Sequence, residues 1–171
     1  MEELNQNVEK IVQTVCFTGH REISDEAMER LPELLGKVIG ELCERGAKVF
    51  RTGGAQGFDT IAALAVLDKK ETYPEIELEL VLPCENQTET WDMAAIQTYH
   101  YIMQKADYAE FLFESYMEGC MRERDRALVD GSDVCVAYCA RSQGGTAFTY
   151  TYAMREGLET INLHEMMGDL D

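Results

Sequence analysis

Residues 49–59 read VFRTGGAQGFD, and this stretch indicates how the chain folds. A short apolar run leads into three glycines, and a helical pattern rich in alanine and leucine begins directly afterwards. Glycine lets backbone N–H groups approach an anion, and the N-terminus of a helix favours negative charge. Parallel α/β folds build their phosphate-binding turns in this way. The stretch therefore predicts a strand, a ligand-binding turn and a helix.

Two further turns of the same kind stand on either side of it in the sequence. Residues 15–21 read VCFTGHR, and residues 134–148 read VCVAYCARSQGGTAF. Strand patterns that alternate with helical patterns imply parallel pairing through right-handed crossovers. We expect an α/β fold of the Rossmann-like, doubly wound type, with a mostly parallel sheet and helices on both faces. The three turns are expected to meet in one composite pocket at the carboxyl edge of that sheet.

The periodicity of the apolar residues gives an expected order of elements. Helical patterns cover residues 24–46, 58–70, 86–105, 120–130 and 144–157. Strand patterns cover residues 12–18, 48–52, 75–83, 108–113, 133–139 and 160–163. Ser24 or Asp25 can cap the first helix, and Pro32 argues for a break or kink early in it.

The bulk composition narrows the function classes. The chain has 171 residues and 46% hydrophobic content, which fits a single domain over residues 1–171. It contains no apolar stretch of membrane-spanning length, and its polar leader, residues 1–10, lacks the pattern of a signal peptide, so we expect a cytoplasmic protein and no membrane partner.

The charge balance points to a small anion as the ligand. A net charge of −17 weighs against nucleic acid as a partner. Local charge differs, because most arginines lie in or near the glycine turns and one helix. These arginines are Arg21, Arg51, Arg122, Arg124, Arg126 and Arg141.

The cysteines do not suggest a metal site. None of the six forms a CxxC pair, and the three histidines lie far from them in sequence, so we expect no bound metal. Cys16, Cys135 and Cys139 sit in apolar runs, where a free cysteine behaves as a small core residue. We therefore expect buried, reduced thiols.

The second turn offers the strongest candidate ligand site. Its glycines free the backbone where the strand becomes a helix, and Asp59 in the first helical turn can accept a sugar hydroxyl. The alternative is a tight structural turn in which Asp59 caps backbone N–H groups. The candidate residues of this turn are Thr52, Gly53, Gly54, Ala55, Gln56, Gly57 and Asp59.

The first turn supplies Thr18, Gly19, His20 and Arg21. Arg21 is expected to hold a phosphate through two parallel hydrogen bonds, which the guanidinium geometry allows. His20 can donate to a phosphate or act as an acid or base, although a neutral hydrogen-bonding role is the more frequent one for a histidine beside an arginine.

The third turn and two other segments complete the candidate set. Gly144, Gly145 and Thr146 open a helix after a buried strand and can hold a second phosphate, unless Thr146 only caps the helix. Arg122 or Arg124 can reach the pocket from the helix over residues 120–130, although surface ion pairing explains most such runs. Pro83 ends a strand beside the expected pocket.

Taken together, these motifs resemble the SLOG superfamily, a Rossmann-like group that includes the YpsA, LOG and DprA proteins. The resemblance is closest to the YpsA-like branch. It covers GHR, RTGGAQGFD, LPCENQTETW, RERDRALVDGSDVCVAY and GGTAFTYTYA, in this order. It implies a Rossmann-like sheet with a pocket for a nucleotide or an ADP-ribose-like molecule, a homodimer by family habit, and a link to bacterial cell division or stress.

The resemblance leaves three functions open. The first is binding or sensing of a nucleotide-derived ligand, with no other cofactor. The second is hydrolysis of a nucleoside-monophosphate N-glycosidic bond, as in LOG-like enzymes, but Thr149 stands where their motif has its catalytic glutamate. Asp59 and Asp125 are the carboxylates that could replace that glutamate. The third is a partner-binding scaffold that keeps the pocket without using it.

Overall fold

The computed structural model describes residues 11–168, which form six strands and six helices. The strands are β1 (Thr14–Gly19), β2 (Val49–Thr52), β3 (Glu77–Cys84), β4 (Tyr108–Phe113), β5 (Val134–Tyr138) and β6 (Glu159–Asn162). The helices are α1 (Asp25–Glu44), α2 (Phe58–Lys69), α3 (Met93–Lys105), α4 (Cys120–Val129), α5 (Gly145–Arg155) and α6 (Leu163–Met167). The leader over residues 1–10 lies outside the described residues.

All six strands pair in parallel, in the order β4-β3-β2-β1-β5-β6. The chain runs outward from β1 to the edge strand β4, then crosses back through α4 to β5 on the other side of β1. The strand order therefore reverses between β1 and β5, where their carboxyl ends leave a crevice. The expected doubly wound α/β fold is confirmed.

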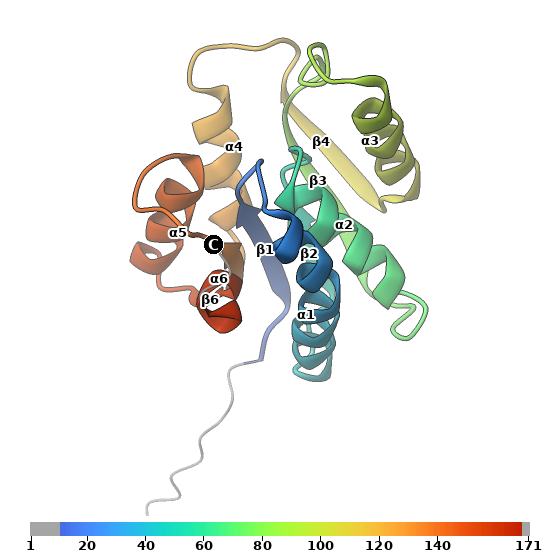
Figure 1. Cartoon of the computed structure of the whole chain (residues 1–171), viewed down its shortest axis with the longest axis vertical. Helices are drawn as coiled ribbons and strands as arrows, with labels where there is room; N and C mark the ends of the chain where they lie inside the picture. Colours follow the sequence, from blue (N-terminus) through green and yellow to red (C-terminus); the bar gives the residue numbers. More distant parts are fainter. Residues whose placement is uncertain (1–10, 169–171) are drawn as a thin grey trace, which may run out of the picture.

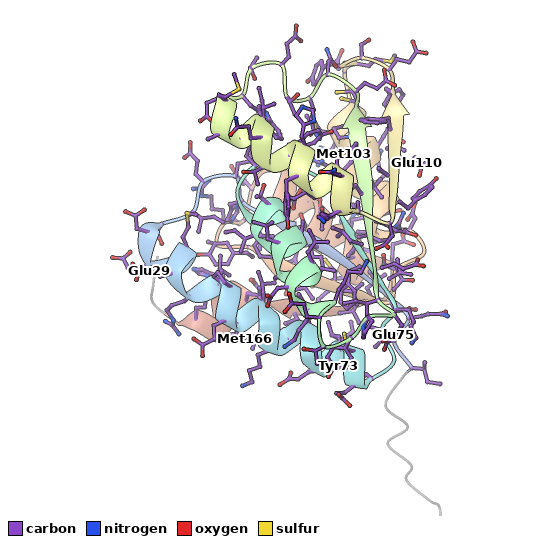
Figure 2. All side chains as sticks on the ribbon, turned by 90° about the vertical axis from the view of Figure 1, so that its right-hand side faces the viewer. Glu29, Tyr73, Glu75, Met103, Glu110 and Met166 are labelled. Carbon is purple, nitrogen blue, oxygen red and sulfur yellow. The ribbon has the colours of Figure 1, made fainter. Side chains whose placement is uncertain are left out.

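Helices cover both faces of the sheet (Figure 1). Helices α1, α2 and α3 lie side by side on one face, as the turned view of Figure 2 shows, and α4 packs with α5 on the other face. Tyr73 and Glu75, labelled in Figure 2, precede β3 and mark the amino edge of the sheet, opposite the crevice.

The apolar core has two parts, one on each side of the sheet. The larger part joins the sheet to α1, α2 and α6 through residues such as Phe17, Phe50 and Leu35. The smaller part packs α4 and α5 against the opposite face and contains Cys16 and Cys135. All six cysteines are free thiols.

Three sequence-based boundaries need correction. Helix α1 begins at the predicted cap, since Ser24 Oγ accepts from Ala27 N at 3.3 Å, but it continues through Pro32 without a break. The helix expected from residue 86 begins only at Met93, because Asp92 Oδ1 accepts from Ala95 N and caps it. A short helix that the sequence analysis did not predict, α6, follows β6.

No helix within residues 11–168 is both long enough and apolar enough to cross a membrane.

Candidate ligand-binding site

A pocket of about 390 Å³ lies at the carboxyl edge of the sheet, in the crevice between β1 and β5. We call it the switch-point pocket. Its walls come from the turns after β1 and β2, from one face of α4 and from the start of α5, so all three glycine turns contribute. The lining residues are Phe17, Thr18, Gly19, His20, Arg21, Glu22, Ala55, Asp59, Met121, Arg124, Asp125, Leu128, Arg141, Gly145 and Thr146.

The N-terminus of α5 faces this pocket through Gly145 and Thr146. The preceding residue, Gly144, has a φ of 102° and supplies no side-chain cap, and the first turn of α5 contains no acidic residue. Thr146 lies within the first turn rather than at the cap position, so it does not cap the helix. The first N–H groups of an uncapped helix carry partial positive charge and attract anions.

The first turn is held in place by His20. Its Nε2 accepts a hydrogen bond from Ala140 N at 2.9 Å, and its carbonyl oxygen accepts from Phe58 N at 3.0 Å. His20 thus ties together the turns after β5, β1 and β2. The neighbouring Arg21 is exposed and lines the pocket, so its guanidinium is accessible to an anionic ligand.

The second turn contributes Ala55 and Asp59 to the pocket, whereas its glycines serve close packing. A Cβ on Gly54 would lie 2.4 Å from Leu82 Cδ2, and one on Gly57 would lie 2.2 Å from the carbonyl oxygen of Arg21. Thr52, Gly53, Gly54 and Gly57 do not line the switch-point pocket. These residues shape the turn from behind, and Ala55 and Asp59 are the part of it that faces the pocket.

Asp59 is a buried carboxyl group on the pocket wall, 6% exposed. Its Oδ2 accepts from Ala55 N at 3.2 Å, so it closes the turn as the structural interpretation expected. Burial raises the pKa of Asp59 from 3.8 to about 6, although Arg124 and the Ala55 N–H act to lower it. A carboxyl group with this pKa can exchange a proton near neutral pH.

Because its pKa is raised, ionised Asp59 lowers the stability of the folded protein at neutral pH. Between about pH 4 and 6 the unfolded chain has lost this proton while the folded protein retains it, so stability falls as pH rises through that window. We expect Asp59→Asn to stabilise the fold at pH 7 by up to about 3 kcal/mol and to have much less effect at pH 4. Urea unfolding of both proteins at the two pH values checks this. An equal effect at both would contradict it.

Arg124 and Asp125 form a buried ion pair on α4, with Arg124 Nε 2.9 Å from Asp125 Oδ1. Arg124 Nη1 also donates to the carbonyl oxygen of Gly53 at 2.6 Å, so α4 is tied to the turn after β2. The pair lines the switch-point pocket. A ligand in this pocket would contact an ion pair whose two charges already neutralise each other, and whose guanidinium and carboxylate groups already make some of their hydrogen bonds.

Other candidate residues lie away from this pocket. Arg122 is exposed, and its guanidinium carbon sits 4.0 Å from the centre of the Phe148 ring. Pro83 is buried within β3 and does not line the pocket. Arg51 donates to three backbone carbonyl groups at the C-terminal end of α4, including that of Ala127 at 2.9 Å. Gln56 lines an adjoining pocket instead.

Several lining residues were not in the candidate set: Phe17, Glu22, Met121, Leu128 and Arg141. Of the two arginines considered on α4, Arg124 lines the pocket and Arg122 does not. The spacing of Cys120, Arg124 and Leu128, four residues apart, places them on one face of α4, but it does not show that this face meets the pocket. Within residues 11–168, no group of three or more histidine, cysteine or acidic side chains is arranged to hold a metal ion.

The family model YpsA, whose description reads YspA SLOG family, matches residues 15–166. The chain belongs to this family. The matched range contains the whole switch-point pocket and all six strands apart from Thr14, the first residue of β1. The predicted family is therefore confirmed, and membership of the SLOG group indicates nucleotide-related binding in general terms.

The chain is also similar to individual proteins. A UPF0398 protein of Brevibacillus brevis is 28% identical over 106 residues, which are 60% of this chain and 56% of that protein. The DNA processing protein A (DprA) of Streptococcus pneumoniae shares the fold at a TM-score of 0.63 with 19% identity, over 87% of this chain and 49% of that one. The chain thus spans about half the length of these two proteins.

A third similarity corrects one expectation. DprA of Helicobacter pylori, whose structure describes a single-stranded DNA binding mode, matches at a TM-score of 0.63 with 20% identity, over 88% of this chain and 64% of that one. The net charge of −17 predicted that nucleic acid is not a partner. That exclusion was wrong, since a protein with this fold binds single-stranded DNA, and net charge alone does not decide the matter.

Proposed function

We propose that this protein binds a nucleotide or a nucleotide-derived ligand, such as an ADP-ribose-like molecule, in the switch-point pocket. The observation that carries the proposal is the uncapped N-terminus of α5, which faces a pocket at the point where the strand order reverses. Open parallel sheets bind ligands at such points, and helix N-termini there receive phosphates. Family membership supports the same assignment.

The charges around the pocket suggest how the ligand lies. The phosphate belongs at Gly145 and Thr146, with Arg21 and Arg141 on the lining beside them as cations. The carboxylates of Asp59 and Asp125 are on the same lining and can accept hydrogen bonds from ribose hydroxyl groups. An anion placed directly against these carboxylates would be repelled, so the phosphate would have to keep clear of Asp125 Oδ2, which lies 3.9 Å from the position of a Cβ on Gly145.

A ligand screen tests the proposal. Thermal unfolding is measured with ADP-ribose, NAD, AMP and GTP, followed by calorimetry on each compound that raises the midpoint. A ligand that binds the folded state alone must raise the midpoint in a concentration-dependent way. We expect at least one of these compounds to do so. Unchanged midpoints at millimolar concentrations of all four would contradict the proposal.

Arg21→Ala is expected to weaken the binding of a phosphate-bearing ligand by about 1.5–3 kcal/mol, because hydrogen bonds to charged groups contribute that much. The corresponding nucleoside should lose far less affinity. Arg155→Ala is the matched control, since Arg155 is exposed at the other end of α5 and outside the pocket. Equal losses for nucleotide and nucleoside, measured by calorimetry, would mean that Arg21 shapes the turn rather than binding phosphate.

A second candidate function is hydrolysis of an N-glycosidic bond, and the raised pKa of Asp59 favours it. The position of Thr149 opposes it. That residue, where LOG-like enzymes carry their glutamate, is fully buried and donates through Oγ1 to the carbonyl oxygen of Gly145 at 2.9 Å. It does not line the pocket.

We therefore expect no efficient release of base from nucleoside monophosphates, since glycosidic cleavage needs a placed carboxylate and an activated water. Chromatography of AMP incubated with the purified protein checks this. Rapid release of adenine that is lost in Asp59→Asn would reverse the order of the two candidate functions.

A further inference from the structure

A second pocket, of about 250 Å³, adjoins the switch-point pocket and has a different chemistry. The two share Arg21, Ala55 and Met121 in their linings, so they meet across the turn after β2. We call it the adjoining pocket. Its outer wall is made by the loop over residues 85–92, after β3, and by the loop over residues 114–119, after β4.

Hydrogen bonds hold these two loops together. Tyr116 N donates to Asn86 Oδ1 at 3.0 Å, and Glu85 N donates to the carbonyl oxygen of Glu114 at 3.3 Å. Asn86 Nδ2 donates in turn to Glu89 Oε2 at 3.3 Å. The wall is thus organised before any ligand arrives, and the carboxylate of Glu89 keeps further acceptor capacity.

Two aromatic side chains line the adjoining pocket. Trp91 is half-buried and packs edge-on against Tyr99, with ring centres 5.5 Å apart. This contact with Tyr99 fixes the position of the Trp91 ring. Tyr116 is 63% exposed, which leaves most of its ring available for contact. An aromatic ring with an accessible face stacks on a nucleobase regardless of the base's identity.

The polar side chains of this pocket suit a base better than a phosphate. Gln56 lines it, and its side-chain amide can both donate and accept hydrogen bonds. Glu89 adds a carboxylate, which repels phosphate and accepts from N–H donors. Apart from the shared Arg21, no lysine or arginine lines this pocket within the described part of the chain.

We infer that the adjoining pocket is a nucleobase subsite, in which Trp91 stacks on the base and Glu89 selects a base with an exocyclic amine. The inference rests on the proposed function, because the phosphate and ribose of the same molecule would occupy the switch-point pocket. Cytosine, adenine and guanine present an amine to Glu89. Uracil presents a carbonyl oxygen where cytosine has its amine, and that oxygen would be repelled.

The chain carries its own probe for this inference, since it contains one tryptophan. The unmodified protein is titrated with CMP, UMP and ribose 5-phosphate while tryptophan emission and binding heat are recorded. We expect CMP to change the emission of Trp91 and to bind about tenfold more tightly than UMP. Ribose 5-phosphate should bind without changing the emission.

Three variants localise the effect. Trp91→Ala is expected to lower the affinity for CMP by about 5- to 150-fold and to leave the affinity for ribose 5-phosphate unchanged. Trp91→Phe should retain most of the affinity for CMP. Glu89→Gln should abolish the preference for CMP over UMP. Tyr108→Ala is the matched control, because Tyr108 is an exposed aromatic residue on β4, outside both pockets.

The possible failures are distinguishable. Binding of CMP and ribose 5-phosphate with equal affinity and no change in emission would overturn the base subsite and leave phosphate binding intact. Binding of cytidine as tightly as CMP, with a change in emission, would support the base subsite and overturn phosphate binding in the switch-point pocket. Absence of binding for all three compounds and for cytidine would overturn both.

Discussion

Gly57→Ala is expected to lower the free energy of unfolding by about 2–6 kcal/mol, a large part of the stability of a domain of this size. Gly57 has a φ of 79°, which side-chain-bearing residues rarely adopt. The new Cβ would also lie 2.2 Å from the carbonyl oxygen of Arg21 and 2.6 Å from that of His20. Backbone strain and overpacking each cost about 1–3 kcal/mol.

Gly144→Ala is the matched control for this prediction. Gly144 also precedes a helix at positive φ, 102°, but a Cβ there would meet no atom within 4 Å. It should therefore show the strain alone, about 1–3 kcal/mol. Urea unfolding followed by circular dichroism measures both variants. Equal losses would mean that the approach of the first turn to Gly57 contributes nothing to stability.

Arg124→Ala is expected to destabilise the protein by about 3–5 kcal/mol, because it leaves Asp125 buried without its partner and removes the bond to the Gly53 carbonyl group. The control lies two residues further along α4. Arg126 is 45% exposed and pairs with Glu123 at 3.0 Å, so Arg126→Ala should cost less than about 1 kcal/mol. A cost for Arg124→Ala no larger than that of Arg126→Ala, in the same unfolding assay, would contradict the tie between α4 and the second turn.

Most of the fold could be predicted from the sequence, because strand and helix patterns alternate along the chain. The errors lie where local chemistry overrides periodicity. Pro32 has a helical pattern on both sides, and packing of Leu31 and Leu35 in the core keeps the helix continuous through it. Residues 86–92 carry a helical pattern, but the cap at Asp92 and the bond from Tyr116 to Asn86 hold them as a loop.

The candidate site was harder to predict, because spacing places residues on a helix but does not say which face meets the sheet. Arg122 and Arg124 look alike in sequence, yet Arg122 packs on Phe148 and Arg124 enters the pocket. The glycines of the second turn also could not be assigned. A glycine that admits an anion and one that admits a neighbouring side chain have the same sequence signature, and only the contacts of Gly53 and Gly54 distinguish them.

The position of the phosphate is the central claim, and amide chemical shifts test it most directly. A ¹⁵N-labelled sample is titrated with inorganic phosphate and with the nucleotide that binds best in the ligand screen. We expect both ligands to shift the amide signals of residues 19–21 and 145–147 most strongly, and only the nucleotide to shift those of residues 86–91 as well. Largest shifts outside the pocket, or no response at residues 145–147, would contradict it.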